Sequence, residues 1–239
     1  MTWSIVAHDA ASGAFAVAVT TCAFAVGASC PYVQAGVGAV STQSMTNRYL
    51  GPAVLDAMAR GLSPAAAIEG ALAGDEGKGL RQIHAVDRHG RSAAFTGANC
   101  VEWCGEIASH GFSVAGNMLA GPAVVADTHA AFLAHGALPL PQRLLAALDA
   151  GEAAGGDRRG RQSAALVMVT TEDFPDLSLR VDDHQDPLAE LRRLYGIWQR
   201  DRAPMLPDQP SKARPSGLTD MDAIEARWAR QGLGLKFRR

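Results

Sequence analysis

Apolar residues in short alternating or continuous runs open the chain and predict a β-hairpin. They occupy residues 2–8 and 14–21, on either side of a turn-forming segment at 9–13. Pairing His8 with Ala14 across this turn places Thr2 opposite about Thr20. The end of the second strand is therefore expected to deliver one of three residues beside Thr2, namely Thr20, Thr21 or Cys22.

The same patterns predict the remaining elements. Strands are expected at 37–40, 111–115, 163–169 and 177–181, and a second hairpin at 82–86 and 92–96. Helical spacing predicts two helices between the hairpins and two before residue 163, with Ser63 capping the second of them before Pro64. Their apolar faces carry Val54, Leu55, Met58 and Leu62; Ile68 and Leu72; Val124, Val125, Thr128 and Phe132; and Leu144, Leu145 and Leu148. A fifth helix follows Pro187, with Leu188, Leu191, Leu194, Tyr195 and Trp198 inward.

The order of these elements predicts an α+β fold. Strands, two helices, strands, two helices and strands follow one another through hairpin-like connections, which favours two largely antiparallel sheets between helix pairs. We expect residues 1–200 to form this domain. Residues 201–239 are expected to form a proline-rich linker and a short helix from about Thr219 to Gln231.

The bulk composition narrows the class of partner. The 239 residues are 48% hydrophobic and 19% charged, with a net charge of -2, so a sizeable core is expected and no electrostatic attraction for nucleic acid or membrane. The first residues lack a basic and apolar leader, and no later run is long enough to span a membrane. A cytoplasmic protein that binds a small neutral or mildly charged molecule is predicted.

Four cysteines, Cys22, Cys30, Cys100 and Cys104, are too few for a disulfide scaffold and are expected to stay reduced. A zinc site built from them is conceivable, but neither spacing is that of a usual zinc knuckle. Buried or surface thiols are the preferred interpretation, and no metal or cofactor is expected.

Thr2 is the most informative residue for chemistry, because it follows Met1 directly. Aminopeptidases remove an initiator methionine when the next side chain is small, so the mature chain is expected to begin with threonine. Such a residue carries a hydroxyl nucleophile and an α-amine whose ordinary pKa of about 8 suits a base near neutral pH. The alternative interpretation is that threonine is simply a common second residue.

Several segments resemble one protein family. They are 4–7, 25–27, 35–40, 116–119 and the glycine- and arginine-rich block 151–163, together with the Val181-Asp182-Asp183-His184 stretch that leads to Asp186 and Pro187. On these segments, which cover about residues 2–200, the chain resembles the DUF1028 family. That family has no assigned function and is placed among the N-terminal nucleophile (Ntn) hydrolases.

The resemblance implies a four-layer αββα sandwich with Thr2 as the nucleophile and its own α-amine as the base. One feature departs from the pattern. Many members, and proteasome-type relatives, place a cationic side chain near the nucleophile, whereas the segment Thr20-Thr21-Cys22-Ala23 offers no cation here. An arginine from elsewhere would have to substitute, the α-amine would have to work without that help, or the chain would be a poor hydrolase.

The loop 155–163 concentrates charged residues and glycines before a buried strand, where polar groups often converge on a site. Asp157 could accept a hydrogen bond from the Thr2 amine, and Arg158 or Arg161 could bind a substrate carboxylate. Ser163, which ends the loop, is counted with the substrate-binding residues. The alternative is a turn fixed by its own Asp and Arg pairs.

Further polar residues follow predicted strands. Asn117 could donate to a developing oxyanion, or could simply occupy a left-handed turn. Thr42 and Gln43 lie where a strand ends before a helix and could line the same cleft, as could Thr20, or they could serve as helix caps.

The run Asp182-Asp183-His184-Gln185-Asp186 contains good metal ligands, and Asp186 before Pro187 is also a natural helix start. The helix start is the preferred interpretation, and a calcium, magnesium or zinc site is the alternative.

Together these features predict an Ntn-type amidohydrolase that cleaves an amide or related C–N bond of a small molecule. The rivals are a non-catalytic binding protein or oligomeric scaffold with the same fold, and a metal-dependent hydrolase centred on His184. A homo-oligomer, most simply a dimer, is expected because the C-terminal segment carries Met221, Ile224 and Trp228 on one face.

Overall fold

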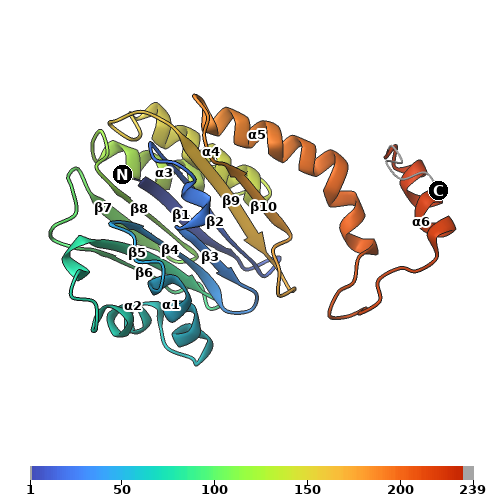
Figure 1. Cartoon of the computed structure of the whole chain (residues 1–239), viewed down its shortest axis with the longest axis horizontal. Helices are drawn as coiled ribbons and strands as arrows, with labels where there is room; N and C mark the ends of the chain where they lie inside the picture. Colours follow the sequence, from blue (N-terminus) through green and yellow to red (C-terminus); the bar gives the residue numbers. More distant parts are fainter. Residues whose placement is uncertain (1, 234–239) are drawn as a thin grey trace. The chain divides into compact units, whose positions relative to one another are not determined.

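Two antiparallel β-sheets form the centre of the main unit in the computed structural model, which describes residues 2–233 (Figure 1). The first sheet has the strand order β10-β9-β2-β1-β8-β7 and the second has the order β3-β4-β5-β6. The strands are β1 (Thr2–Asp9), β2 (Ala14–Thr21), β3 (Pro31–Gln34), β4 (Gly38–Ser44), β5 (Arg81–Asp87), β6 (Ser92–Thr96), β7 (Gly105–Ser109), β8 (Phe112–Asn117), β9 (Ser163–Val169) and β10 (Leu177–Val181).

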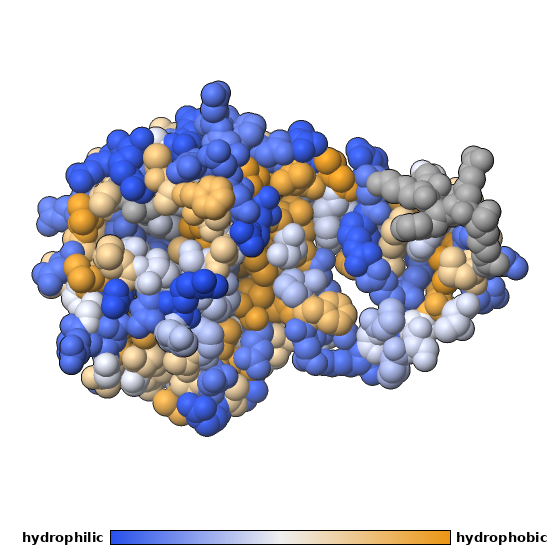
Figure 2. Space-filling view, in the orientation of Figure 1, coloured by the Kyte–Doolittle hydropathy of each residue, from blue (hydrophilic) through white to orange (hydrophobic). Residues whose placement is uncertain are grey.

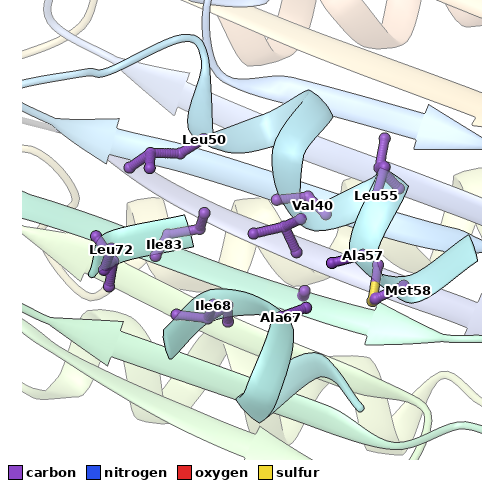
Figure 3. Close-up of a cluster of buried hydrophobic side chains, with 11 residues drawn as sticks. Val40, Leu50, Leu55, Ala57, Met58, Ala67, Ile68, Leu72 and Ile83 are labelled. Carbon is purple, nitrogen blue, oxygen red and sulfur yellow. The ribbon is translucent and has the colours of Figure 1, made fainter. Parts of the chain in front are cut away.

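A pair of helices covers the outer face of each sheet. Helices α1 (Leu50–Ala59) and α2 (Pro64–Leu72) pack on β4, β5 and β6, while α3 (Ala123–Ala134) and α4 (Leu140–Ala153) pack on β1, β2, β7 and β8. Figure 3 shows the apolar cluster under the first pair, in which Val40 and Ile83 of the sheet meet Leu55, Met58 and Ile68 of the helices. The predicted four-layer αββα sandwich is thus confirmed.

The layer between the two sheets changes character along its length. At one end it is apolar, with Val6, Phe15, Val17, Ala39, Val86 and Val169 buried together. Toward the start of β1 the buried side chains are polar, and Ser4, Ser41, Gln43, Gln82 and His84 are fully enclosed. Buried polar groups must find partners inside the protein, so this polar end is where the fold departs from an ordinary core.

Most predicted elements are confirmed, including the buried helix faces and the Ser63 cap, whose side chain accepts from the Ala66 amide at 3.3 Å. Leu62 is one exception, because α1 ends at Ala59 and the Leu62 side chain is 41% exposed. Leu194 and Trp198, also predicted inward, are only partly buried. Strands β3 and β7 escaped prediction. Both are short strands at sheet edges with incompletely buried side chains, so neither carries the apolar alternation of a central strand.

Strands β3 and β9 lie side by side where the two sheets meet, and Figure 2 shows hydrophobic surface along this line. A cavity of about 330 Å³ lies there, lined by Val33, Ala35, Leu55, Val169 and Phe174 among others. Val169 pairs with Phe15 at the beginning of β2, so this edge is remote from Thr2.

Contacts divide the described residues into two compact units, with the boundary between Leu191 and Arg192, and this boundary falls within α5 (Pro187–Ile197). In the second unit the predicted linker starts with helical turns, Trp198–Arg202 and Ala203–Asp208. The predicted terminal helix is present as α6 (Met221–Arg230). Buried Asp208 accepts from the Trp228 indole at 2.7 Å and pairs with Arg227, which ties α6 to the turn before it.

No helix within residues 2–233 is both long enough and apolar enough to cross a membrane.

Candidate active site at the start of β1

Thr2 is the first residue of the central strand β1, and its side chain lies on the face between the sheets. Ser4, which shares that face because side chains alternate along a strand, contacts Ser41, Gln43 and His84 of the opposite sheet. The Thr2 hydroxyl donates to the Thr21 hydroxyl across 3.3 Å, and Thr2 is 7% exposed. Two threonine hydroxyls therefore meet at the end of the β1–β2 hairpin.

The register of this hairpin corrects the prediction that placed Thr2 opposite Thr20. The ladder pairs Asp9 with Ala14 and Trp3 with Thr20, one residue away from the expected register. Asp9 stays in the ladder because its carboxylate accepts from the Ala11 amide at 3.3 Å and its carbonyl accepts from Gly13 at 2.8 Å. A one-residue shift turns every side chain to the other face, so Thr20 points away from Thr2.

Two amide side chains contact the main chain of Thr2, and a third amide side chain contacts both of them. Asn117, the ladder partner of Thr2 on β8, and Gln43 on β4 each donate to the Thr2 carbonyl oxygen at 3.4 Å. The Gln82 Oε1 atom on β5 accepts from both of these amides at 2.9 Å. All three side chains are buried, so the group connects both sheets behind the candidate nucleophile.

Gln82 and His84 were not among the predicted site residues. Their signal lay in strand β5, where polar Gln82 and His84 alternate with apolar Ile83 and Ala85. Alternation in a strand that is buried on both faces predicts that the polar set needs internal partners. The Nε2 atom of His84 lies 2.7 Å from the Ser4 hydroxyl, and burial lowers the pKa of the ring to about 3, so it is neutral.

Asp157 lies beside the end of β2, the strand that pairs with β1. Its carboxylate accepts from the Cys22 amide at 2.7 Å and from the Arg159 amide at 2.8 Å, and it forms an ion pair with the Arg159 side chain. Asp157 is only 5% exposed. These contacts fix the position of Cys22, the residue after Thr21. The ion-pair partner of Asp157 is Arg159, which is neither of the two arginines predicted to bind substrate.

The other predicted residues of this loop lie apart. Arg158 is exposed, and Arg161 pairs with Glu152 and, at 3.5 Å, with Asp186. The Ser163 hydroxyl donates to the Ala23 carbonyl at 2.6 Å, and its own carbonyl accepts from Thr20 at 3.1 Å. Ser163 and Thr20 therefore anchor the chain that follows Thr21.

Thr42 and Gln43 lie on opposite faces of β4. Gln43 reaches the Thr2 carbonyl, whereas the Thr42 hydroxyl contacts the Asn47 carbonyl at 3.4 Å. Residues Ser44 and Met118, which directly follow Gln43 and Asn117, have φ angles of 71° and 58°. These left-handed conformations bend both strands away immediately after their amide residues.

The acidic run before α5 forms local contacts, of which the Asp186 bond is typical of a helix start. Asp186 accepts from the Ala189 amide at 3.1 Å, and Asp182 pairs with Arg180 at 2.9 Å. Asp183 accepts from Gln162 at 3.1 Å. Within residues 2–233, no group of three or more His, Cys, Asp or Glu side chains is arranged to hold a metal ion.

Comparison with known proteins places the main unit in context. A family model described as a family of unknown function, DUF1028, matches residues 2–191. A solved structure of a DUF1028 protein from Silicibacter pomeroyi has a TM-score of 0.85 and 31% identity, covering 92% of this chain and 96% of that chain. Anbu, an ancestral β-subunit from Yersinia bercovieri, aligns with a TM-score of 0.38 and 10% identity over 81% of this chain and 93% of that chain. None of the curated proteins matches the chain.

Proposed function

The chain belongs to the DUF1028 family, and on that basis we propose that it is an Ntn-type hydrolase that cleaves an amide or related C–N bond of a small molecule. After loss of Met1, the Thr2 hydroxyl is the nucleophile and the Thr2 α-amine is the base. The observation that supports this function is the Thr2 hydroxyl at the head of the central strand, 3.3 Å from the Thr21 hydroxyl in the polar layer between the sheets.

The reaction would proceed in two steps. The α-amine accepts the proton of Thr2 Oγ1 as that oxygen bonds to the substrate carbonyl carbon, and the same proton then goes to the departing amine as the C–N bond breaks. Water next attacks the acyl-enzyme, the α-amine accepts its proton, and that proton returns to Oγ1 as the ester bond breaks and the acid is released. Thr2 is regenerated, and the net reaction is hydrolysis.

The other predicted site residues take narrower roles in this proposal. Asp157 orients the turn after Thr21 through the Cys22 amide. Arg158 and Arg161 remain candidates for substrate binding at the exposed rim of that loop. Thr20 and Ser163 support the site from behind, and the Asn117 amide points to the Thr2 carbonyl.

The test combines mass spectrometry with a covalent probe. Intact mass of natively purified protein should show loss of Met1, and periodate, which cleaves vicinal amino alcohols, should convert the N-terminal threonine to an aldehyde. A β-lactone should acylate the protein once, and Thr2→Ala should abolish the adduct while leaving the melting temperature nearly unchanged. Because β-lactones also acylate thiols, Cys22→Ser is the matched control and should keep the adduct. If protein that retains Met1 still forms the adduct, the proposed mechanism is wrong.

A non-catalytic binding protein is the second candidate function, supported by a separate cavity. About 500 Å³ of space lies between α2 and β6, lined by Ile68, Leu72, Ala93 and Phe95, with Glu69 and Lys78 among its polar residues. This size fits a small molecule. Ligands that raise the melting temperature equally in the wild type and in Thr2→Ala, but not in Phe95→Ala, would favour this function.

We also propose a homo-oligomer, most simply a dimer, formed through the C-terminal unit. Its exposed apolar side chains Leu218 and Met221 support this assembly. Light scattering of the full-length chain measures the oligomeric state directly, and a monomer at all concentrations would contradict the proposal.

A further inference from the structure

We propose that Gln82 is a positioning residue for Thr2, acting through the amide side chains of Gln43 and Asn117. This role rests on the proposed function, because it concerns the geometry of the same nucleophile. Gln82 is fully buried on β5 and belongs to the sheet opposite Thr2.

The hydrogen bonds define a fixed order of donors and acceptors. Gln82 Oε1 accepts from Gln43 Nε2 and from Asn117 Nδ2, both at 2.9 Å. The same two nitrogens also donate to the Thr2 carbonyl oxygen, each at 3.4 Å. A buried oxygen therefore holds two amide groups in the orientation in which both face Thr2.

The amide nitrogen of Gln82 fixes Gln82 itself. It donates to the Thr96 hydroxyl at 2.8 Å and to the Gly116 carbonyl at 2.8 Å. Gln43 likewise donates to the Ala115 carbonyl at 3.1 Å and accepts from the Ser4 hydroxyl at 2.7 Å. These bonds attach the network to strands β1, β6 and β8, so the amides have little freedom to turn elsewhere.

A terminal strand residue needs such a support. The first residue of a chain lacks a preceding residue to hold it and tends to fray, whereas a nucleophile must keep its geometry to within a fraction of an ångström. The bonds of 3.4 Å are individually weak, but they act together in a layer from which water is excluded. The network thus holds Thr2 in place by hydrogen bonds. The neighbouring segment Thr20-Thr21-Cys22-Ala23 contributes no cationic side chain to the site.

Two substitutions of Gln82 separate this role from general stability. Gln82→Leu keeps the approximate size but removes the oxygen that aligns both amides. Gln82→Glu retains an acceptor for them, and burial favours the protonated carboxyl group, whose O–H can donate to the Gly116 carbonyl in place of the amide. This variant should therefore rescue the geometry. Ser113→Ala is the matched control, because Ser113 is equally buried between the sheets and contacts His84 at 3.2 Å, yet it pairs with Val6 rather than Thr2.

The first measurement is hydrogen–deuterium exchange of the full-length protein. Exchange of the peptide at the start of β1 should rise about tenfold in Gln82→Leu, and should stay near the wild-type value in Gln82→Glu and Ser113→Ala. This readout does not require Thr2 to be a nucleophile. Equal exchange in all four proteins, or the same increase in Ser113→Ala as in Gln82→Leu, would overturn the positioning role.

The second measurement is the rate of β-lactone acylation of Thr2 in Met1-free protein. We expect a loss of about tenfold or more in Gln82→Leu, with near-normal rates in Gln82→Glu, because small displacements of a nucleophile are costly. Periodate oxidation, which needs only a free N-terminal threonine, should proceed alike in all variants. Normal acylation of Gln82→Leu refutes the positioning role, whereas a wild type that resists the lactone while the exchange result holds refutes only the proposed hydrolase.

Should Gln82→Leu fail to fold, Asn117→Ala serves in its place. It removes one donor to the Thr2 carbonyl and leaves the Gln43–Gln82 bond in place. The expected exchange and acylation changes have the same direction with smaller size, and their absence in folded Asn117→Ala overturns the proposal.

Discussion

The hydroxyl oxygens of Thr2 and Thr21 lie 3.3 Å apart on the face between the two sheets. The two residues come from neighbouring strands joined by the first hairpin, and both are almost fully enclosed. In the proposed mechanism Thr2 Oγ1 loses its proton to the α-amine, so a neighbouring hydroxyl is well placed to stabilise the resulting oxygen by donating a hydrogen bond.

We therefore predict that Thr21→Val slows β-lactone acylation of Thr2 by about tenfold or more, the range expected for loss of one hydrogen bond to a developing charge. Valine keeps the shape of the side chain and removes its hydroxyl. Thr20→Val is the control, because Thr20 faces away from Thr2 and its hydroxyl contacts the Ser163 carbonyl. Intact mass against time gives both rates, and equal slowing in the two variants would contradict the assignment.

This pair also marks the limit of what the sequence allowed. The central strands and most of the helix faces follow from periodicity, because burial of a strand or helix face requires it, whereas the sandwich follows from the order of the elements and from the family resemblance. The register of the first hairpin could not be predicted in this way, because it depended on whether Asp9 belonged to the strand or to the turn. The hydrogen bond that the Asp9 carboxylate accepts within the turn keeps Asp9 in the strand. Composition can rank loop residues as candidates, but Asp157 and Arg159 pair through contacts that span the fold, such as the one to Cys22.

The amide network illustrates a different limit. Gln43 and Asn117 stood out because each follows a predicted strand, but Gln82 lies within one, where a polar residue is easily assigned to a solvent-facing side. Only the stacking of the second sheet on the first encloses that face. The predicted nucleophile Thr2 and the substrate-binding role of Arg158 stay predictions that chemistry has to test.

The second prediction concerns pH and the buried His84. Burial lowers its pKa from 6.5 to about 3, so between these values the unfolded chain binds a proton that the folded chain does not. The stability linked to neutral His84 is therefore complete above about pH 6.5 and is lost as the pH falls toward 3, at about 1.4 kcal/mol per pH unit.

Urea unfolding between about pH 4 and pH 6.5 measures this contribution, because this range lies inside the interval of about 3 to 6.5. His84→Gln should reduce the slope of the free energy of unfolding against pH by the amount that corresponds to nearly one bound proton. The overall stability of this variant should fall, because the contacts of His84 with Ser4 and Ser113 are lost. His8 and His129, whose pKa values burial also lowers, remain in both proteins and cancel in the comparison. Parallel curves for the two proteins would show that His84 does not titrate in this range on unfolding.

The third prediction concerns Asp157. Its carboxylate is buried and accepts from the Cys22 and Arg159 amides, so Asp157→Ala leaves both donors without that partner. We expect a loss of about 1–3 kcal/mol in the free energy of unfolding. Exposed Arg158→Ala is the control from the same loop and should change it by less than about 0.5 kcal/mol. Similar stability of the two variants in urea titrations would show that the loop is held by other contacts.

The last prediction compares two helical glycines. A Cβ atom on Gly151 in α4 would lie 2.2 Å from the Thr128 hydroxyl and 2.8 Å from the Trp3 indole nitrogen, whereas a Cβ on Gly70 in α2 would meet nothing within 4 Å. Gly70→Ala should therefore stabilise the protein by up to about 1 kcal/mol through helix propensity. Gly151→Ala should destabilise it by about 1–3 kcal/mol, because α3 or Trp3 must move.

Trp3 links this clash to the candidate site, since it directly follows Thr2 and is 1% exposed on the helix-covered face of β1. Movement of Trp3 would shift the backbone that carries the Thr2 hydroxyl, so Gly151→Ala should also slow acylation of Thr2, while Gly70→Ala should leave that rate unchanged. Urea titrations and acylation rates on the same preparations test both statements. A Gly151→Ala protein that is destabilised but acylated at the wild-type rate would mean that α3 yields to the new methyl group and that Trp3 and Thr2 keep their places.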